Sequence, residues 1–298
     1  MTAPSPRRLA AALSLSLLLS ACGPAPREPA PGSERLRLVT WNVHDLFDES
    51  DDPLTQDPVP RPDTVARKLA RVGAVLARLD ADVIVLQEVE SLALLERLAR
   101  GPPLAALGYV HLHLTEGRDP RGIDVAVLSR RPLARCVSHL ADRDAAGAHL
   151  FSRDLSEVHL AVAGRPVVLL AAHLASKREP QDALRAAQAA RADAIARDLL
   201  SGLPGALVVV AGDLNDLPGS APLRPLLADP LLADLGALVA PADAYTYTPP
   251  AYRGRLDYLV ASANALDWLA RVEVAGGDDV EAASDHRPVL AELWVPPP

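Results

Sequence analysis

The chain has 298 residues, of which 49% are hydrophobic and 23% are charged, so its composition is that of a globular protein rather than a disordered or fibrous one. The formal net charge of −8 argues against tight, non-specific binding to nucleic acid, but it leaves room for an enzyme that acts on phosphates. Only 3% of the residues are aromatic, and we therefore expect an aliphatic core. No second boundary is visible, which favours one folded domain.

The N-terminus has the pattern of an export signal. Arg7 and Arg8 precede an apolar stretch, Leu9–Leu19, that is too short to span a bilayer core about 30 Å thick. The sequence that follows, Leu-Ser-Ala-Cys, ends at Cys22 and resembles the lipobox of bacterial lipoproteins. This resemblance implies a signal peptide over residues 1–21, a lipid on Cys22 and attachment to a membrane, with the outer membrane favoured where the host has one. The alternative is an ordinary secretory signal with a chance cysteine.

A tether follows the signal. Residues 22–34 are rich in Pro and Gly and have no apolar periodicity, so we expect an extended segment before a folded domain over residues 35–298. Cys136 is the one further cysteine, and no internal disulfide is therefore expected. Its apolar neighbours predict a small buried side chain.

Strands and helices alternate along the domain. After a strand over Leu36–Trp41 and an acidic loop over residues 48–63, apolar residues recur at helical spacing from Val65 to Leu79, with Asp63 or Thr64 as the helix cap. A second helical pattern covers Leu184–Leu199. Further strands are predicted at Asp82–Gln87, Ile123–Leu128, Val158–Ala163, Val167–Ala172, Ala206–Ala211, Leu256–Ala261, Leu269–Val274 and Pro288–Trp294. The alternation indicates an α/β protein with more strands than helices.

Polar side chains follow several of these strands at the point where each strand ends. They are Asn42, Glu88, His173, Asp213 and Asp257. Each one alone fits an ordinary cap or turn residue. Together they supply carboxylate and amide oxygens, which are suited to Mg²⁺ or Mn²⁺, and an imidazole that can transfer protons or contact phosphate. We interpret the set as a functional site carried on a rigid scaffold.

Eight segments resemble, in order, motifs of the endonuclease/exonuclease/phosphatase superfamily, which includes DNases, abasic-site endonucleases and bacterial sphingomyelinases. They read TWNVHDLFD, DVIVLQEVE, RGIDVAVLSR, FSRD, AAHLASK, VVAGDLNDLPGS, RLDYLV and SDHRPV, and they cover the chain from about residue 36 to residue 296. The resemblance implies a four-layer α/β sandwich, in which two mixed β-sheets pack face to face with helices on the outside. It places the site at one edge of the sandwich.

The resemblance also implies a role for each matching residue. It assigns catalysis to His286, Asp257, Asp213 and His173, with Asp124 supporting His173; contact with the substrate phosphate to Asn215, Arg153 and Asn42; and the metal, Mg²⁺ or Mn²⁺, to Glu88, Asn42 and Asp285. A divalent ion neutralises charge on the phosphate, and positioned donors stabilise the charge that develops in the transition state. Asp257 is expected to hold His286 in one tautomer and to raise its pKa.

Two features depart from the family pattern. Many bacterial relatives have a glutamate two residues after the asparagine, whereas this chain has His44, followed by Asp45. The chain also has few lysines near the expected phosphate-binding loops, namely Lys68 and Lys177. Arginine can take their place, but we expect modest affinity for long polyanions.

The expected activity is hydrolysis of phosphodiester bonds by a divalent-metal-dependent phosphoesterase, nuclease-like and monomeric, with a phosphate ester such as nucleic acid as its substrate. One alternative is a hydrolase of sphingomyelin, phospholipid or small phosphate esters. A lipid hydrolase needs an exposed apolar loop, and the loop over residues 48–63 is acidic. A second alternative is a non-catalytic binding lipoprotein on the same fold.

Overall fold

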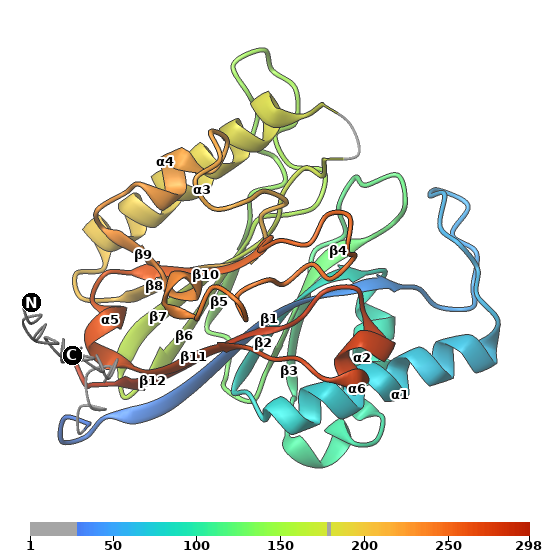
Figure 1. Cartoon of the computed structure of the whole chain (residues 1–298), viewed down its shortest axis with the longest axis horizontal. Coiled ribbons are helices and arrows are strands. Elements are labelled where there is room, and N and C mark those ends of the chain that lie inside the picture. The colour runs from blue at the N-terminus through green and yellow to red at the C-terminus, as the bar shows by residue number, and fades with distance from the viewer. Residues whose placement is uncertain (1–28, 178–179) are drawn as a thin grey trace, which may run out of the picture.

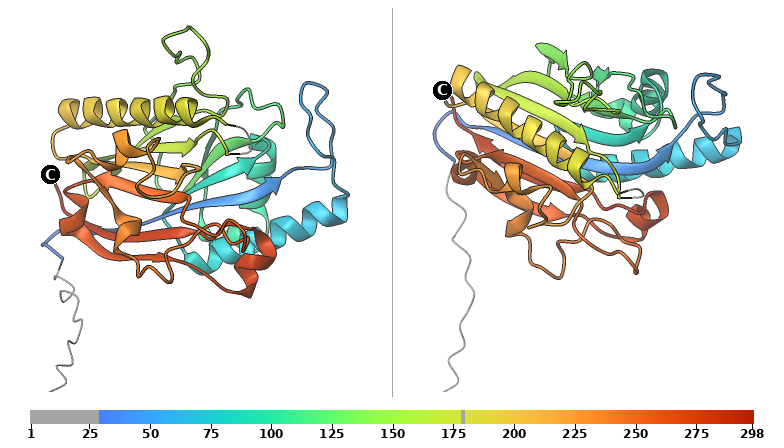
Figure 2. Two further views of the ribbon diagram at one scale, coloured as in Figure 1. Left: turned by 45° about the horizontal axis from the view of Figure 1, so that its top comes forward. Right: turned by 90° about the horizontal axis from the view of Figure 1, so that it is seen from above.

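Two mixed β-sheets pack face to face, with helices on both outer sides (Figure 1, Figure 2). The computed structural model describes residues 29–177 and 180–298, so the predicted signal peptide and Cys22 lie outside the described residues. The layers confirm the α/β sandwich expected from the sequence. Within the described ranges, no helix is both long and apolar enough to cross a membrane.

The first sheet has the strand order β11-β12-β1-β2-β4-β3. Its strands are β1 (Glu34–Leu46), β2 (Val83–Val89), β3 (His111–Leu114), β4 (Asp124–Ser129), β11 (Leu269–Val274) and β12 (Val289–Val295). β1 runs parallel to β2 and antiparallel to β12. The outer face is covered by α1 (Pro62–Leu79), α2 (Leu92–Arg100), the 3₁₀ turn η1 (Leu104–Leu107) and α6 (Asp278–Ala283).

The second sheet has the order β5-β6-β7-β8-β10-β9 and again contains one parallel pair, β7 with β8. Its strands are β5 (Arg135–Ser138), β6 (Ser156–Val162), β7 (Arg165–His173), β8 (Leu207–Asp213), β9 (Leu232–Asp234) and β10 (Asp257–Ser262). α3 (Asp182–Gly202) and α4 (Arg224–Leu227) cover its outer face, and the short elements η2 (Leu235–Leu238) and α5 (Ala265–Trp268) flank β10.

The core is aliphatic, as the composition predicts, and it has three parts. One lies between the two sheets, and the other two lie between each sheet and its helices. Because side chains alternate across a strand, β1 sends Leu36 and Leu38 into the layer between the sheets and Val39 and Trp41 toward the helices. Both faces of the central strands are therefore buried, which explains their continuous apolar runs.

The structure corrects several local predictions. α1 begins at Pro62, and its cap, Arg61, makes no side-chain hydrogen bond, so neither Asp63 nor Thr64 caps the helix. α2 was not predicted from the sequence, although Ser91 caps it through its hydroxyl. Cys136 is exposed rather than buried, because it lies on the short edge strand β5.

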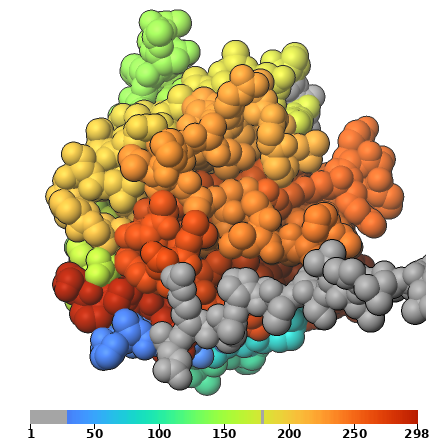
Figure 3. Space-filling view, turned by 60° about the vertical axis from the view of Figure 1, so that its left-hand side comes forward, coloured from blue at the N-terminus to red at the C-terminus, as the bar shows by residue number. Residues whose placement is uncertain are grey.

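The topology brings several strand ends together at one end of the sandwich. β1 and β2 are parallel, as are β7 and β8, so their carboxyl ends meet in pairs. Glu34 at the start of β1 pairs with Val295 at the end of β12, so the two ends of the described chain lie at the other end. Figure 3 shows the side of the molecule near the chain ends, where segments from α3 onward form most of the surface.

Candidate functional site

A cavity of about 690 Å³, the site cavity, opens at the carboxyl ends of β1, β2, β7 and β8. Seven of the predicted site residues line it: Asn42, Glu88, His173, Asp213, Asn215, Asp285 and His286. They come from five motifs that are far apart in the sequence, and the topology alone brings them together. Asp257 is fully buried and lies against His286.

The backbone around the site is unusual. Glu88, His44, Asp45 and Asn215 all have positive φ angles, of 64°, 53°, 56° and 54°. Non-glycine residues seldom adopt this conformation, and it persists where the surrounding structure holds it in place. The strand ends are therefore shaped to direct these residues rather than to continue the sheet.

His286 and Asp257 form a fixed pair. The Nδ1 atom of His286 lies 2.8 Å from Oδ2 of Asp257, and the Asp257 amide donates to Oγ1 of Thr246 at 3.0 Å. The backbone of His286 is held on both sides, because its carbonyl accepts from Nε1 of Trp41 and its amide donates to Oγ of Ser284. Burial alone would lower the pKa of His286, but the charges of Asp257 and the neighbouring carboxylates outweigh it and raise the pKa to about 10. His286 is therefore a cation at neutral pH.

Asp213 stands at the centre of the cavity floor. Its Oδ2 accepts from Nδ2 of Asn42 at 3.0 Å and lies 3.6 Å from Nε2 of His173 and 3.9 Å from Nε2 of His286. Its Oδ1 accepts from the amide of Asn215 at 2.8 Å. Burial, with the nearby charge of Asp257, raises the pKa of Asp213 to about 7. A carboxylate with this pKa is suited to act as a general base at neutral pH.

Glu88 forms the second acidic position. Its Oε1 accepts from Nδ2 of Asn42 at 3.2 Å, and its Oε2 accepts from the amide of Asp45 at 2.9 Å. Burial would raise the pKa of Glu88, but these donors and the guanidinium of Arg121, at 3.9 Å from Oε1, hold it below its usual value. Glu88 is therefore ionised, and Asn42 joins it to Asp213.

His44, which departs from the family pattern, pairs with Asp285. Its Nδ1 lies 2.9 Å from Oδ1 of Asp285, and this contact holds the pKa of His44 above its usual value. Nζ of Lys68 donates to the carbonyls of His44 and Ala283, at 2.8 and 2.6 Å, and thereby connects the two loops that carry the pair. Burial lowers the pKa of Lys68 to about 8.

His173 is neutral and is not paired with Asp124. Burial lowers the pKa of His173 well below its usual value, and its buried Nδ1 has no hydrogen-bond partner among the described residues. Asp124 accepts through Oδ1 from the amide of Gly117 at 2.9 Å and lines a different cavity. The prediction that Asp124 supports His173 is therefore wrong in this structure, because the loop that carries Gly117 takes up the carboxylate.

Arg153 lies behind the site rather than in it. Its Nε and Nη2 donate to the carbonyls of His173 and Leu174, at 3.2 and 2.8 Å, and its Nη1 contacts Asp119 at 3.1 Å. Arg153 is buried and does not line the site cavity. Its donors are used to hold the end of β7, so the structure gives it a positioning role instead of the predicted contact with phosphate.

Several residues that line the cavity were not predicted from the sequence. Arg121 precedes β4 within the RGID motif, where a basic residue beside a conspicuous acid could have been noticed. The ring of Tyr247 lies 4.9 Å from the ring of His286. Also missed were Ser176, Leu217, Ala251, Tyr252, Arg253 and Leu256.

The donor set fits a divalent cation. Asp213, Asp257 and His286 place one ligand atom each within 4.8 Å of one another, and one buried oxygen of Asp257 has no hydrogen-bond partner among the described residues. Glu88 and Asp285, the predicted ligands, line the same cavity. The amide oxygen of Asn42 accepts from the amide of His44, and its Nδ2 donates to Glu88 and Asp213. The part of Asn42 in metal binding stays a prediction. Because His286 is protonated, the ligands available to such an ion are the carboxylate oxygens, which suit Mg²⁺ or Mn²⁺.

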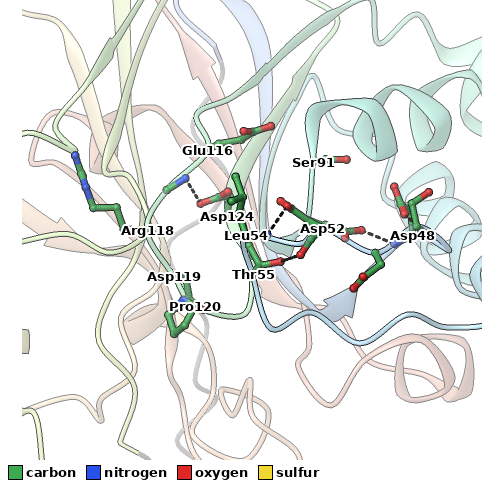
Figure 4. Close-up of a pocket in the computed structure, with 15 residues that line it drawn as sticks. Asp48, Asp52, Leu54, Thr55, Ser91, Glu116, Arg118, Asp119, Pro120 and Asp124 are labelled. Atoms are coloured by element: carbon green, nitrogen blue, oxygen red, sulfur yellow. Dashed lines mark hydrogen bonds between the residues drawn. The ribbon is translucent and has the colours of Figure 1, made fainter.

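A second cavity of about 370 Å³, the acidic cavity, lies between the loop after β1 and the loop before β4 (Figure 4). Its carboxylates are Asp48, Asp51, Asp52, Glu90, Glu116, Asp119 and Asp124. The side chain of Arg118 points away from them and donates to the carbonyl of Leu140. Burial raises the pKa of Asp124 and of Glu90 to about 7.

Comparison with solved structures finds the same fold in proteins of low sequence identity. An endonuclease/exonuclease/phosphatase from Beutenbergia cavernae has 26% identity and a TM-score of 0.61, over 88% of this chain and 72% of its own. TDP2 of Danio rerio (D. rerio), in complex with a single-strand DNA product, has 20% identity and a TM-score of 0.62, over 87% and 98% of the two chains. The human Nocturnin catalytic domain with bound sulfate has 17% identity and a TM-score of 0.63, over 87% and 93%.

No curated protein matches the sequence. The family model described as "Endonuclease/Exonuclease/phosphatase family" matches residues 39–286, which is most of the chain and includes every strand end that contributes to the site cavity. The chain belongs to the endonuclease/exonuclease/phosphatase family.

Proposed function

We propose that this chain is a divalent-metal-dependent phosphoesterase that hydrolyses phosphodiester bonds, nuclease-like, by attack of water on phosphorus. The observation that carries the proposal is the contact between Asp213 and the His286–Asp257 pair at the floor of the site cavity. A base with a pKa of about 7 stands 3.9 Å from an imidazolium with a pKa of about 10. Two groups whose environments separate their pKa values suit complementary roles in acid–base chemistry.

Each residue of the floor has a role that follows from its contacts. Asp213, when ionised, accepts the proton of a water held above it. His286 presents positive charge, and a proton at Nε2, to the phosphate and its leaving oxygen, while Asp257 fixes the ring through Nδ1. Neutral His173, 3.6 Å from Asp213, contacts a phosphoryl oxygen together with Asn215.

We infer that the metal binds at the Glu88 side of the cavity. Glu88 and Asp285 would hold it, with Asp213 across from them, because His286 already neutralises the Asp257 side of the floor. A divalent ion bound there supplies neutralisation of charge on the phosphate oxygens. Carboxylate oxygens are the ligands that Mg²⁺ and Mn²⁺ prefer, and we therefore propose one of these two ions.

Nucleic acid is the favoured substrate class. TDP2 from Danio rerio binds a single-strand DNA product, and human Nocturnin binds sulfate, an anion with the shape of phosphate; both have the fold of this chain. The alternative, a hydrolase of sphingomyelin, phospholipid or small phosphate esters, uses the same floor. The second alternative, a binding lipoprotein without activity, is disfavoured because the floor retains acid, base and ligand groups together.

We also propose that the protein is an exported lipoprotein, lipidated at Cys22 and attached to a membrane, the outer one where the host has two. The support is the pattern of the first residues, which lie outside the described part of the chain. Labelling cells with a palmitate analogue tests this. A lipid on the wild-type protein that is lost in Cys22→Ala is expected, and equal labelling of both would contradict it.

A substrate panel tests the activity. Metal-stripped protein is assayed on bis-p-nitrophenyl phosphate, supercoiled plasmid and sphingomyelin, with Mg²⁺, with Mn²⁺ and with chelator alone. Metal-dependent cleavage of the first two is expected. Cleavage of sphingomyelin alone would favour the lipid alternative, and cleavage of none would favour a binding protein.

A further inference from the structure

The two sides of the site cavity differ in chemistry. One side carries the charged floor, with Glu88, Asp213 and His286. The other side is built from the loop after β8 and the loop before β10. It is mainly apolar and presents Leu217, Tyr252 and Leu256, beside the cation of Arg253, to the same cavity. The hydrolytic chemistry uses the first side only, so the apolar side is left for a part of the substrate other than the phosphate.

Tyr252 is the most notable residue of this side. It is 77% exposed, although aromatic residues are rare in the chain, and it lines the cavity instead of contributing to the core. Leu217, also in the lining, is 46% exposed. Exposed apolar side chains at the mouth of a polar site indicate contact with a ligand more often than scattered ones do.

The loop that presents Tyr252 is held in shape. The amides of Thr246 and Tyr247 both donate to the carbonyl of Gly254 at 2.9 Å, and the amide of Tyr252 donates to the carbonyl of Pro249 at 3.0 Å. Both ends are thus closed by backbone hydrogen bonds.

Stacking fixes the base of the same loop. The Tyr245 ring lies under two guanidinium groups, that of Arg253 at 4.6 Å and that of Arg287 at 4.1 Å. A β-carbon on Gly254 would stand 2.5 Å from a methyl group of Leu217, so a larger residue there would displace Leu217. The Tyr252 ring is therefore presented on a preformed support, which reduces the entropy cost of binding.

We propose that Tyr252, with Leu217, forms a subsite for a nucleobase of the substrate, so that the enzyme favours phosphodiesters that carry a planar base next to the scissile phosphate. The inference rests on the proposed phosphodiesterase activity and adds the substrate group that the cavity selects. A planar ring offers a face to Tyr252, and stacking of this kind tolerates any base sequence. It also adds affinity beyond that of the basic residues in the cavity, Arg121, Lys177 and Arg253.

A lipid surface is a weaker fit for these residues. Insertion into lipid needs a broad apolar face with basic residues around it, whereas Tyr252 and Leu217 are two side chains that line a cavity, and the chain is acidic overall. The cavity is large enough for a nucleotide-sized group, because sites for small molecules occupy about 300–1,000 Å³.

The test compares two substrates that share one phosphodiester. One is thymidylyl-thymidine, and the other is its analogue with a hydrogen in place of each base. Wild-type protein is expected to favour the first by about tenfold in kcat/KM, mainly through KM, since stacking on one base is worth about a factor of ten or more. In Tyr252→Ala the ratio is expected to fall to about one, whereas Tyr252→Trp and the distant surface variant Leu238→Ala keep it.

Binding of the product checks the same subsite without turnover. Calorimetry is expected to give about tenfold tighter binding of thymidine 5′-monophosphate than of deoxyribose 5-phosphate to wild-type protein, and equal binding to Tyr252→Ala. An unchanged preference in Tyr252→Ala, or no preference in the wild type, overturns the subsite while metal-dependent cleavage of bis-p-nitrophenyl phosphate still supports the proposed function. If wild-type protein shows no base preference but binds phosphatidylcholine vesicles more tightly than Tyr252→Ala does, the subsite is overturned in favour of a lipid contact. Loss of all cleavage in wild-type protein is the failure of the proposed function itself.

Discussion

The site cavity and the acidic cavity are both lined by carboxylates, but they balance their charges in different ways. In the site cavity, each acid has a positive or donor group directed at it: His286 for Asp257, Asn42 for Asp213 and Glu88. In the acidic cavity, Asp124 and Glu90 each accept from one backbone amide and Arg118 points elsewhere, while Asp119 is paired with Arg153 and Arg121. Burial raises the pKa of Asp124, Glu90 and Asp213 alike. The site cavity differs because the cation of His286 is fixed beside its acids, so that an acid and a base with separated pKa values lie together.

The largest expected effect comes from breaking the site pair. Asp257→Asn removes the charge that outweighs burial at His286, so the pKa of His286 falls and its ring is no longer held in one tautomer. We expect kcat to decrease by about 10²–10⁴-fold. Steady-state kinetics on bis-p-nitrophenyl phosphate measure this, with the exposed Asp278→Asn as the matched control. A kcat within about twofold of wild type would contradict the pairing.

The pH dependence of kcat distinguishes the two cavities. In the proposed mechanism Asp213 is a base only when ionised, so activity is expected to rise as the pH increases through about 7. His286 has its proposed role only as the cation, so activity is expected to fall above about 10. Asp124 also titrates near 7 but does not touch the site. Asp124→Asn should therefore keep the rise in activity near pH 7. If this rise is lost in Asp124→Asn, it belongs to Asp124 and not to Asp213.

A smaller effect is expected for stability at Asp124. Its pKa in the folded state, about 7, lies above the usual value of 3.8, so the folded protein binds the proton more tightly and loses stability as the pH rises from about 4 to about 7. The loss is at most of the order of 4 kcal/mol. Asn cannot ionise and can still accept from Gly117. Asp124→Asn is expected to raise Tm at about pH 8 and to leave it unchanged at about pH 4.

Thermal unfolding in the presence of a chelator measures this difference. Glu281→Gln, at an exposed position, serves as the control because its charge is not buried. An equal Tm shift at both pH values would mean that folding does not raise the pKa of Asp124.

Most of the fold and of the candidate site was predicted from apolar runs, from the polar residues at their ends and from family motifs. Long apolar runs such as the one before Asp213 report buried strands directly, because a strand covered on both faces needs apolar residues at every position. The family motifs then placed His286 beside Asp257. Neither the apolar runs nor the family motifs depend on the path of a loop. The structure therefore agrees with what each of them predicts.

The errors arose where contacts depend on loops. Whether Asp124 meets His173 or Gly117 is decided by the path of the chain before β4, and the donors of Arg153 are taken by carbonyls that no motif reveals. Tyr252 was missed for a similar reason, since an isolated aromatic residue in a loop has no periodicity to mark it. Cys136 was predicted to be buried from its neighbours, which cannot show that β5 is an edge strand.

The proposed role of His286 is that of the cation in a metal-dependent phosphodiesterase. Its most direct test is the rate of bis-p-nitrophenyl phosphate hydrolysis by metal-stripped wild type, His286→Ala and the exposed control His149→Ala, each with Mg²⁺ or Mn²⁺ added back. We predict hydrolysis that requires the metal, is kept in His149→Ala and is reduced by about 10²–10⁴-fold in His286→Ala. Full metal-dependent activity in His286→Ala would contradict the account.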